Sequence, residues 1–155
     1  MAEPSATFGS EDRGMTLVRV FDATRERIWA EWTEPERFAD WYGGAASEVP
    51  ASSVSMDVRA GGGWRATMFA GPERHEIGWE GGYVEVFEPS LLMLTVTDTP
   101  GGEKRDLLTV VLTDLGGGRT EMLFRQRGWM TPKQYEAAGQ GWGTFFERMA
   151  DRLTG

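Results

Sequence analysis

Cysteine is absent from this 155-residue sequence, and histidine is nearly so. The lack of cysteine excludes disulfides, thiolate metal ligands and a cysteine nucleophile. The single histidine, His75, lies in "HEIGW", which lacks the second histidine of an H-E-x-x-H zinc motif. No G-x-S-x-G elbow supports a serine hydrolase. We therefore expect His75 to be an exposed turn residue, and we expect neither a metal site nor a cofactor.

Positive charge and long apolar runs are also scarce. The chain has 24 acidic and 16 basic residues, a formal charge of −8, and no basic cluster longer than Lys104–Arg105. This balance argues against nucleic acid and anionic membranes as partners. No apolar run approaches the length of a membrane span, and the first residues lack the pattern of a signal peptide. We expect a cytoplasmic protein without membrane insertion.

Bulky apolar side chains are abundant instead. Seven tryptophans, eight phenylalanines and eight methionines predict a core, or a cavity wall, built from large and adaptable groups. A chain of this length forms one domain that buries roughly 70% of its unfolded surface. We expect a disordered tail over residues 1–13 and a single domain over residues 14–155.

The order of predicted elements is strand, two short helices, a meander of strands and a long helix. Residues 15–21 alternate as a strand does, and the period then changes to that of a helix over residues 23–33. Thr33 and Glu36 have the spacing of a capping box for a second short helix. Thr131 and Gln134 have the same spacing before the final helix. Glycine-rich turns separate six further strand candidates: 53–60, 62–70, 75–87, 91–98, 106–115 and 119–127.

Three glycines interrupt the final helix at every second position: Gly139, Gly141 and Gly143. A dinucleotide fingerprint places glycines directly after a strand at the start of a helix, with the spacing G-x-G-x-x-G. Here the spacing differs and the helix has already begun, so the stretch is not a nucleotide loop. Each glycine costs about 1 kcal/mol relative to alanine within a helix. Either a close backbone contact with the sheet or open space for a ligand would account for them.

Four stretches resemble a known family in order and spacing. "RVFDATRERIWAEWTEPERFADWYGG" is similar to an entry pattern "DA-P-ERVW-AWT-PE----WWG", and "DVRAGGGWRATM" to "D-RPGG-WR". "WEGGYVEVFEPSLLMLT" is similar to "G-Y-E--PPERL--T", and "GWGTFFERMADRL" to "GW--SL--L---L". The family is the SRPBCC superfamily, also called START/Bet v 1-like, in the branch of activator of heat shock protein 90 ATPase homologue-like proteins. The resemblance spans about residues 16–153, with departures at Thr24, Tyr42 and Glu88.

The resemblance implies an α+β helix-grip fold. A six- to seven-stranded antiparallel sheet would curve around the long C-terminal helix, with two short helices after the first strand. It also implies a cavity that often holds an apolar molecule, and hence a protein that binds a small, mainly apolar ligand. Two alternatives stay open: a cyclase- or hydrolase-type enzyme that uses a cavity carboxylate, and a chaperone-interacting or other protein-interaction module. A homodimer is a further expectation.

Alternation along the strands and helical spacing predict which side chains line such a cavity, although the same residues would also serve as plain core. The predicted ligand-binding residues are Trp64, Met68, Trp79, Tyr83, Met122, Phe124, Trp142, Phe145, Phe146 and Met149. Trp41 and Trp129 are predicted at the cavity rim.

Carboxylates on predicted strands are the candidates for acid–base chemistry. An inward-facing carboxylate would be desolvated, and its pKa would rise toward a working range. Glu80, Glu85 and Asp98 lie on strands in this way, and Glu80 and Glu85 are the catalytic candidates. Glu85 corresponds to the glutamate of the "Y-E" element, where it would alternatively pair with an arginine such as Arg65. Glu80 or Arg65 would also orient a ligand.

Overall fold

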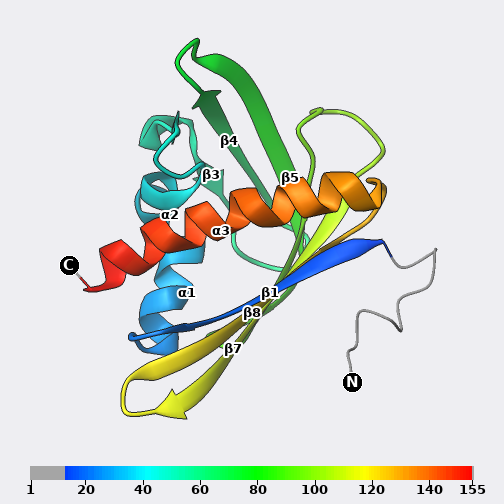
Figure 1. Ribbon diagram of the computed structural model, residues 1–155. Coiled ribbons are helices and arrows are strands. Elements are labelled where there is room, and N and C mark those ends of the chain that lie inside the picture. Colours follow the sequence, from blue (N-terminus) through cyan, green and yellow to red (C-terminus); the bar gives the residue numbers. More distant parts are fainter. Residues whose placement is uncertain (1–12, 155) are drawn as a thin grey trace.

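A curved antiparallel sheet lies against one side of a long C-terminal helix (Figure 1). The structure is a computed structural model that describes residues 13–154, so most of the expected tail, and residue 155, lie outside the described residues. The helices are α1 (Arg25–Thr33), α2 (Pro35–Trp41), a short 3₁₀ turn η2 (Ala51–Ser53) and α3 (Pro132–Thr154). The strands are β1 (Gly14–Phe21), β2 (Ser47–Glu48), β3 (Ser55–Met56), β4 (Gly63–Ala70), β5 (His75–Phe87), β6 (Leu91–Val96), β7 (Asp106–Gly116) and β8 (Arg119–Arg127).

The sheet has the order β1-β8-β7-β6-β5-β4-β2, with β3 paired to β4. The predicted meander from β4 to β8 is confirmed, and β1 joins its far edge beside β8. Two strands differ from expectation. Only Ser55–Met56 of the candidate 53–60 forms a strand, and the two-residue strand β2 was not expected. The described sheet therefore has eight strands in the α+β arrangement that the resemblance implied.

Strand β5 changes partner midway, and this change opens the sheet. Its first part pairs with β4 up to Gly82, and its last part pairs with β6 from Tyr83 onward. Gly81 lies at the change, where an added Cβ would come within 1.7 Å of the Thr95 carbonyl oxygen. Only glycine permits this close approach. A last bridge joins Glu80 to Thr97, and before Glu80 the described part of β5 pairs with β4, so the β4–β5 hairpin extends away from the rest of the sheet (Figure 1).

Helix ends follow their capping residues, with one correction. Thr24 caps α1 by accepting a hydrogen bond from the backbone N–H of Arg27. The predicted capping box of α3 is confirmed, because Thr131 and Gln134 bond each other's backbone N–H. The predicted N-cap Thr33 is wrong: it is the last residue of α1, its hydroxyl donates to the Trp29 carbonyl, and Glu34 takes the cap position of α2. The Thr33 hydroxyl thus bonds to a carbonyl one turn earlier in α1 and is not available to cap α2.

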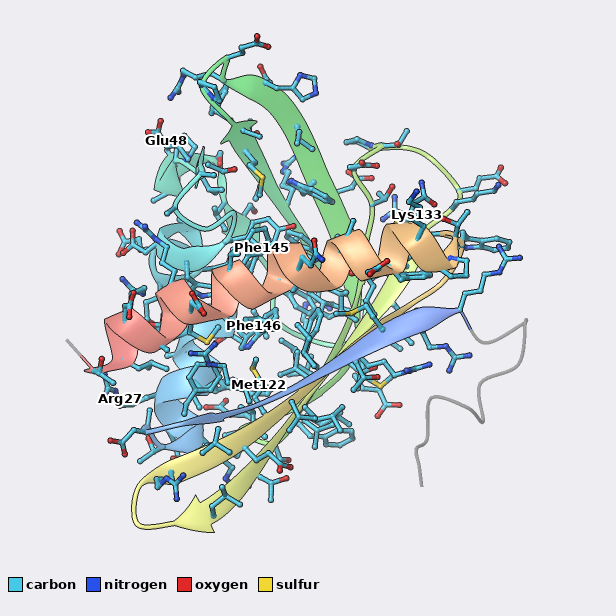
Figure 2. All side chains as sticks on the ribbon, in the orientation of Figure 1. Arg27, Glu48, Met122, Lys133, Phe145 and Phe146 are labelled. Atoms are coloured by element: carbon cyan, nitrogen blue, oxygen red, sulfur yellow. The ribbon has the colours of Figure 1, made fainter. Side chains whose placement is uncertain are left out.

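Aromatic rings fill the space between α3, the short helices and the sheet. Trp32 lies at the centre, with ring centroids 4.8 Å from Trp41 and 6.0 Å from Phe124. Phe146 of α3 reaches the same cluster, while its neighbour Phe145 leaves the helix in a different direction (Figure 2). The opposite face of the sheet exposes Val18 and Phe87. The long axis of α3 is thereby held over an aromatic core.

An ion pair fastens the C-terminal half of α3 to α1. Glu31 is 2% exposed, and Arg152 donates to both of its carboxylate oxygens at 2.7 and 3.1 Å. Arg152 also binds Asp40 at 2.7 Å. These bonds raise the pKa of Arg152, the Glu31 bond most of all. The N-terminal half of α3 makes no ion pair to another element within the described residues; its Tyr135 and Trp142 instead donate hydrogen bonds to Asp106 and Gln126. The pocket lies beneath that half.

Candidate functional site

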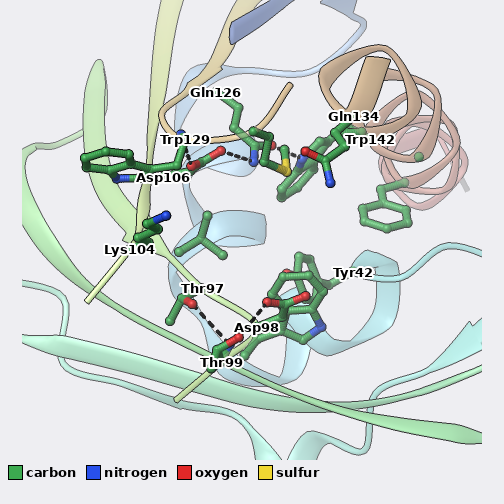
Figure 3. Close-up of a pocket in the computed structure, with 16 residues that line it drawn as sticks. Tyr42, Thr97, Asp98, Thr99, Lys104, Asp106, Gln126, Trp129, Gln134 and Trp142 are labelled. Carbon is green, nitrogen blue, oxygen red and sulfur yellow. Dashed lines mark hydrogen bonds between the residues drawn. The ribbon is translucent and has the colours of Figure 1, made fainter. Parts of the chain in front are cut away.

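A pocket of about 430 Å³ lies under the N-terminal half of α3, where β5 diverges from β6 (Figure 3). Its apolar wall comes from α3, from β5 and from the residue after α2. Its polar wall comes from the segment between β6 and β7 and from the ends of β7 and β8. The lining residues are Tyr42, Trp79, Val96, Thr97, Asp98, Thr99, Lys104, Asp106, Gln126, Trp129, Met130, Gln134, Ala138, Gly141, Trp142 and Phe145.

Four rings form what we call the aromatic wall: Tyr42, Trp79, Trp142 and Phe145. Tyr42 contacts the other three, with centroid distances of 6.0 Å to Trp79, 5.7 Å to Trp142 and 5.6 Å to Phe145. Edge and tilted contacts of this kind hold the rings in fixed orientations. The aromatic wall therefore presents a preformed apolar surface to the pocket.

A hydrogen-bonded network centred on Asp106 forms the opposite wall. Its Oδ2 accepts from Gln126 Nε2 at 2.9 Å and from the Tyr135 hydroxyl at 2.8 Å, and its Oδ1 accepts from the Trp129 backbone N–H at 3.1 Å. The Gln126 Oε1 accepts from the Trp142 indole at 2.9 Å. Because an indole only donates and a carboxylate only accepts, these partners determine the orientation of the Gln126 amide.

Burial, more than hydrogen bonding, sets the pKa values of the tyrosines near the site. Desolvation raises the pKa of Tyr135 to about 12, and the bond to Asp106 acts in the same direction. Desolvation also raises the pKa of Tyr42, with a smaller contribution from the negative charge of Asp98. Both phenols therefore stay neutral at physiological pH. Tyr135 acts here as a hydrogen-bonding group, through Asp106 and the Met130 backbone N–H, and neither phenol acts as an anion.

Two oppositely charged side chains lie at different sides of the mouth. Asp98 is exposed and lies beside Tyr42, where its carboxylate accepts from the Thr99 hydroxyl at 3.2 Å (Figure 3). Lys104 lies beside Trp129, its ammonium 5.6 Å from the ring centroid. Trp129 is 63% exposed. The mouth is thus polar and charged, whereas the interior is aromatic.

One pocket-lining indole has no hydrogen-bond partner. The Nε1 atom of Trp79 is buried and makes no hydrogen bond to any described residue. Leaving a buried donor unpaired costs about 1–3 kcal/mol. Two other buried groups share this state, Trp32 Nε1 and the Tyr83 hydroxyl, and neither lines the pocket.

The structure divides the predicted ligand-binding residues into two groups. Trp79, Trp142 and Phe145 line the pocket, as does the predicted rim residue Trp129. The remaining seven do not line it and are core residues: Trp64, Met68, Tyr83, Met122, Phe124, Phe146 and Met149. The predicted rim residue Trp41 is also core; it is fully buried, and its indole donates to the Glu31 carbonyl at 2.9 Å. Trp41 is the last residue of α2 and its ring packs against Trp32 in the aromatic core, so it does not reach the pocket.

The three helix glycines have three different surroundings. A Cβ on Gly139 would come within 3.2 Å of the Met15 side chain, so this glycine faces a packed side chain of β1. Gly141 lines the pocket, and an added Cβ there would meet nothing within 4 Å. Gly143 also faces open space but does not line the pocket. The sequence left two explanations open, a close backbone contact with the sheet or open space for a ligand. Neither explanation holds for all three glycines, and only Gly141 leaves open space at the pocket.

Of the carboxylates considered for acid–base chemistry, the catalytic candidates Glu80 and Glu85 lie outside the pocket, whereas Asp98 lines it. Glu80 accepts from Arg105 at 2.7 Å and from the Gly101 backbone N–H at 3.0 Å. These bonds, the backbone one first, lower its pKa, opposite to the rise expected for a buried acid. Glu85 is exposed on β5 opposite Met93, and Arg65 is exposed on β4 opposite Glu80, so the expected Glu85–Arg65 pair is absent. Glu80 fastens the segment that forms the polar wall. His75 is exposed at the start of β5, as expected.

Asp106 and Gln126 were missed by the sequence reasoning. Both lie on the inward face of their strands, since Asp106 alternates with Leu108 and Gln126 with Phe124. A polar residue on an otherwise apolar face was the available signal.

Across the described residues, no group of three acidic, histidine or cysteine side chains has the arrangement of a metal site. No helix in that part of the chain is long and apolar enough to cross a membrane.

Comparison with known proteins agrees with this architecture. Residues 22–154 match the family described as "Activator of Hsp90 ATPase homolog 1-like protein". The chain belongs to this family. The comparison with curated proteins returned no match.

Solved structures with the same fold share little sequence with this member of the Activator of Hsp90 ATPase homolog 1-like family. A protein from Chromobacterium violaceum is 22% identical with a TM-score of 0.79, over 90% of this chain and 96% of its own. The AHSA1 protein from Silicibacter pomeroyi is 18% identical with a TM-score of 0.79, over 92% of this chain and 98% of its own. A protein from Nitrosomonas europaea is 22% identical with a TM-score of 0.78, over 95% and 97%. At these identities the likeness concerns the fold.

Proposed function

We propose that this protein binds a small, mainly apolar molecule in the pocket between its sheet and the N-terminal half of α3. The observation that carries the proposal is the aromatic wall facing a pocket of about 430 Å³, a volume typical of small-molecule sites. Apolar surface buried against these rings supplies affinity at about 25 cal/mol per Å². The Asp106 network and the polar mouth supply orientation.

Gly141 supports the same proposal. A glycine within this 23-residue helix lowers helix stability by about 1 kcal/mol relative to alanine. Gly141 lines the pocket and has open space where a side chain would be, so the glycine leaves room for a ligand beneath the helix. The Trp79 ring, whose buried N–H has no partner among the described residues, belongs to the wall of the same space.

A fluorescence titration with the neutral dye N-phenyl-naphthylamine tests the proposal. We expect saturable binding of one dye per chain. Ala138→Leu places a larger side chain at a lining position and weakens binding by about tenfold or more, whereas Ala137→Leu, its exposed neighbour on α3, leaves binding unchanged. Non-saturable dye fluorescence, or equal binding by both variants, would contradict a site in this pocket.

Native mass spectrometry supplies the matching observation without a chosen probe. Protein purified from its own host is sprayed under conditions that keep complexes intact. We expect a species heavier than the chain by the mass of one small molecule, lost on mild activation and absent from Ala138→Leu. A bound mass that persists in that variant would place the molecule elsewhere.

A further inference from the structure

Charge around the mouth distinguishes between classes of ligand. Three charged side chains line the pocket: Asp98, Lys104 and Asp106. The Asp106 oxygens already accept three hydrogen bonds within the protein. The Lys104 ammonium lies over the exposed Trp129 ring. Asp98 is the charged lining group that remains available to a ligand beside the aromatic wall.

The surroundings of Asp98 leave its negative charge uncompensated. Its one hydrogen bond within the described residues comes from the neutral hydroxyl of Thr99, its neighbour in the chain, and no cationic group of that region lies within ion-pair distance. The negative charge of Asp98 also acts on Tyr42 and helps to raise the pKa of its phenol. Tyr42 in turn contacts each of the other rings of the aromatic wall. A carboxylate therefore stands at the open edge of a set of aromatic faces (Figure 3).

Aromatic faces together with a carboxylate are the elements that recognise organic cations. The electron-rich face of an aromatic ring attracts a cation within about 6 Å of its centroid, and a carboxylate adds a charge-assisted hydrogen bond. The chain's net charge of −8 attracts cations over longer distances. An apolar body inside the pocket would leave a charged head at the exposed mouth, where desolvation costs least.

We propose that the pocket takes an apolar or aromatic molecule that carries a protonated amine, with the apolar body against the aromatic wall and the ammonium at Asp98. This inference rests on the proposed function and specifies its ligand class. The Tyr42 ring and the Asp98 carboxylate together hold the ammonium, and Lys104 repels it from the other side of the mouth. An anionic analogue would be attracted to Lys104 and repelled by Asp98.

Three probes with the same naphthalene body test the proposal: naphthylmethylamine, which is cationic at neutral pH, naphthalenemethanol, which is neutral, and naphthoate, which is anionic. Each competes with the neutral dye at low ionic strength. We expect the amine to bind about five- to tenfold more tightly than the alcohol, and naphthoate to bind more weakly than both, from one ion pair and one cation–π contact. Salt should reduce the preference for the amine.

The variants assign the preference to one side chain. Asp98→Asn should remove the share of the amine's preference that the ion pair supplies and leave only the share from the cation–π contact, without changing affinity for the alcohol. Glu103→Gln removes an exposed carboxylate from the same segment that does not line the pocket, and it should retain the preference. Retention of the full preference in Asp98→Asn would overturn the assignment to Asp98.

The outcomes also separate this inference from the proposed function. Equal binding of amine and alcohol to the unmodified protein, or tightest binding of naphthoate, would overturn the amine proposal while leaving an apolar site. Failure of all three probes and of the dye would overturn both.

Discussion

The glycines of α3 offer a matched set of substitutions that separates helix stability from pocket occupancy. Gly141 and Gly143 both lie within the helix, and an added Cβ at either position meets nothing within 4 Å. Replacing either with alanine removes the glycine penalty without a clash. We expect each change to raise the free energy of unfolding by about 1 kcal/mol, or about 2–4 °C in Tm for a domain of this size.

Leucine at the same two positions should separate their roles. Gly141→Leu directs a four-carbon side chain into the pocket. Because this side chain occupies volume that the dye needs, dye binding should weaken by at least about tenfold. Gly143→Leu carries the same side chain at a position that does not line the pocket, and dye binding should not change. Gly139→Ala gains less stability than the other two, because its Cβ comes within 3.2 Å of Met15.

Chemical denaturation and dye titration measure the two effects on the same samples. Unfolding followed by tryptophan fluorescence gives the free energy of unfolding, and the dye gives the dissociation constant. The reasoning is refuted if Gly141→Leu binds the dye as the unmodified protein does. It is refuted equally if Gly143→Leu loses binding to the same degree, since the two positions would then not differ in their relation to the pocket.

Three further predictions concern buried polar groups. Asp106→Ala leaves three donors without their acceptor and should lower the free energy of unfolding by about 2–4 kcal/mol in urea denaturation. Arg152→Met leaves the buried Glu31 carboxylate short of its main partner and should cost about 2–3 kcal/mol, most of it recovered by adding Glu31→Gln. All three tyrosines are buried with raised pKa values, that of Tyr135 to about 12. Since the unfolded chain loses phenol protons near pH 10 and the folded chain retains them, the contribution of the tyrosines to stability should be constant below that pH, and stability should fall between about 10 and 12.

Each of these predictions has its own control and contrary result. Glu136→Ala and Lys133→Met, both exposed on α3, should change stability by less than about 0.5 kcal/mol. An Asp106→Ala variant as stable as these controls would show that the network is not coupled to folding. In an alkaline titration, tyrosinate absorbance should appear together with loss of structure; three phenols that titrate near pH 10 in the folded protein would contradict their burial.

Elements with local signals were predictable from the sequence, as the final helix illustrates. Its capping box depends on Thr131 and Gln134, three residues apart, and its apolar face depends on spacing along one helix. Both are confirmed. The signal for Thr33 was equally local but had two competing solutions, and the hydroxyl bonded to the preceding turn instead.

The pocket depends on relations between distant parts of the chain, so the sequence predicted it only in part. Alternation placed Trp79 inward, but whether it borders open space depends on where the pairing of β5 with the β6 side ends, at the Glu80–Thr97 bridge. Met68 and Tyr83 are packed in the core. The partners of Asp106 lie 20 and 29 residues away along the chain. No short pattern encodes contacts at that separation.

The indole N–H signals of the seven tryptophans test the central claim most directly. In a two-dimensional ¹H–¹⁵N spectrum, each tryptophan gives one resolved indole signal. We predict that addition of the neutral dye shifts the signals of the pocket residues Trp79, Trp129 and Trp142. The signals of the core residues Trp41 and Trp64 should stay in place, because their indoles donate to the backbone carbonyls of Glu31 and Thr95, which do not line the pocket. Dye-induced shifts confined to core or surface tryptophans outside this pocket, or no shifts at saturating dye, would contradict the account.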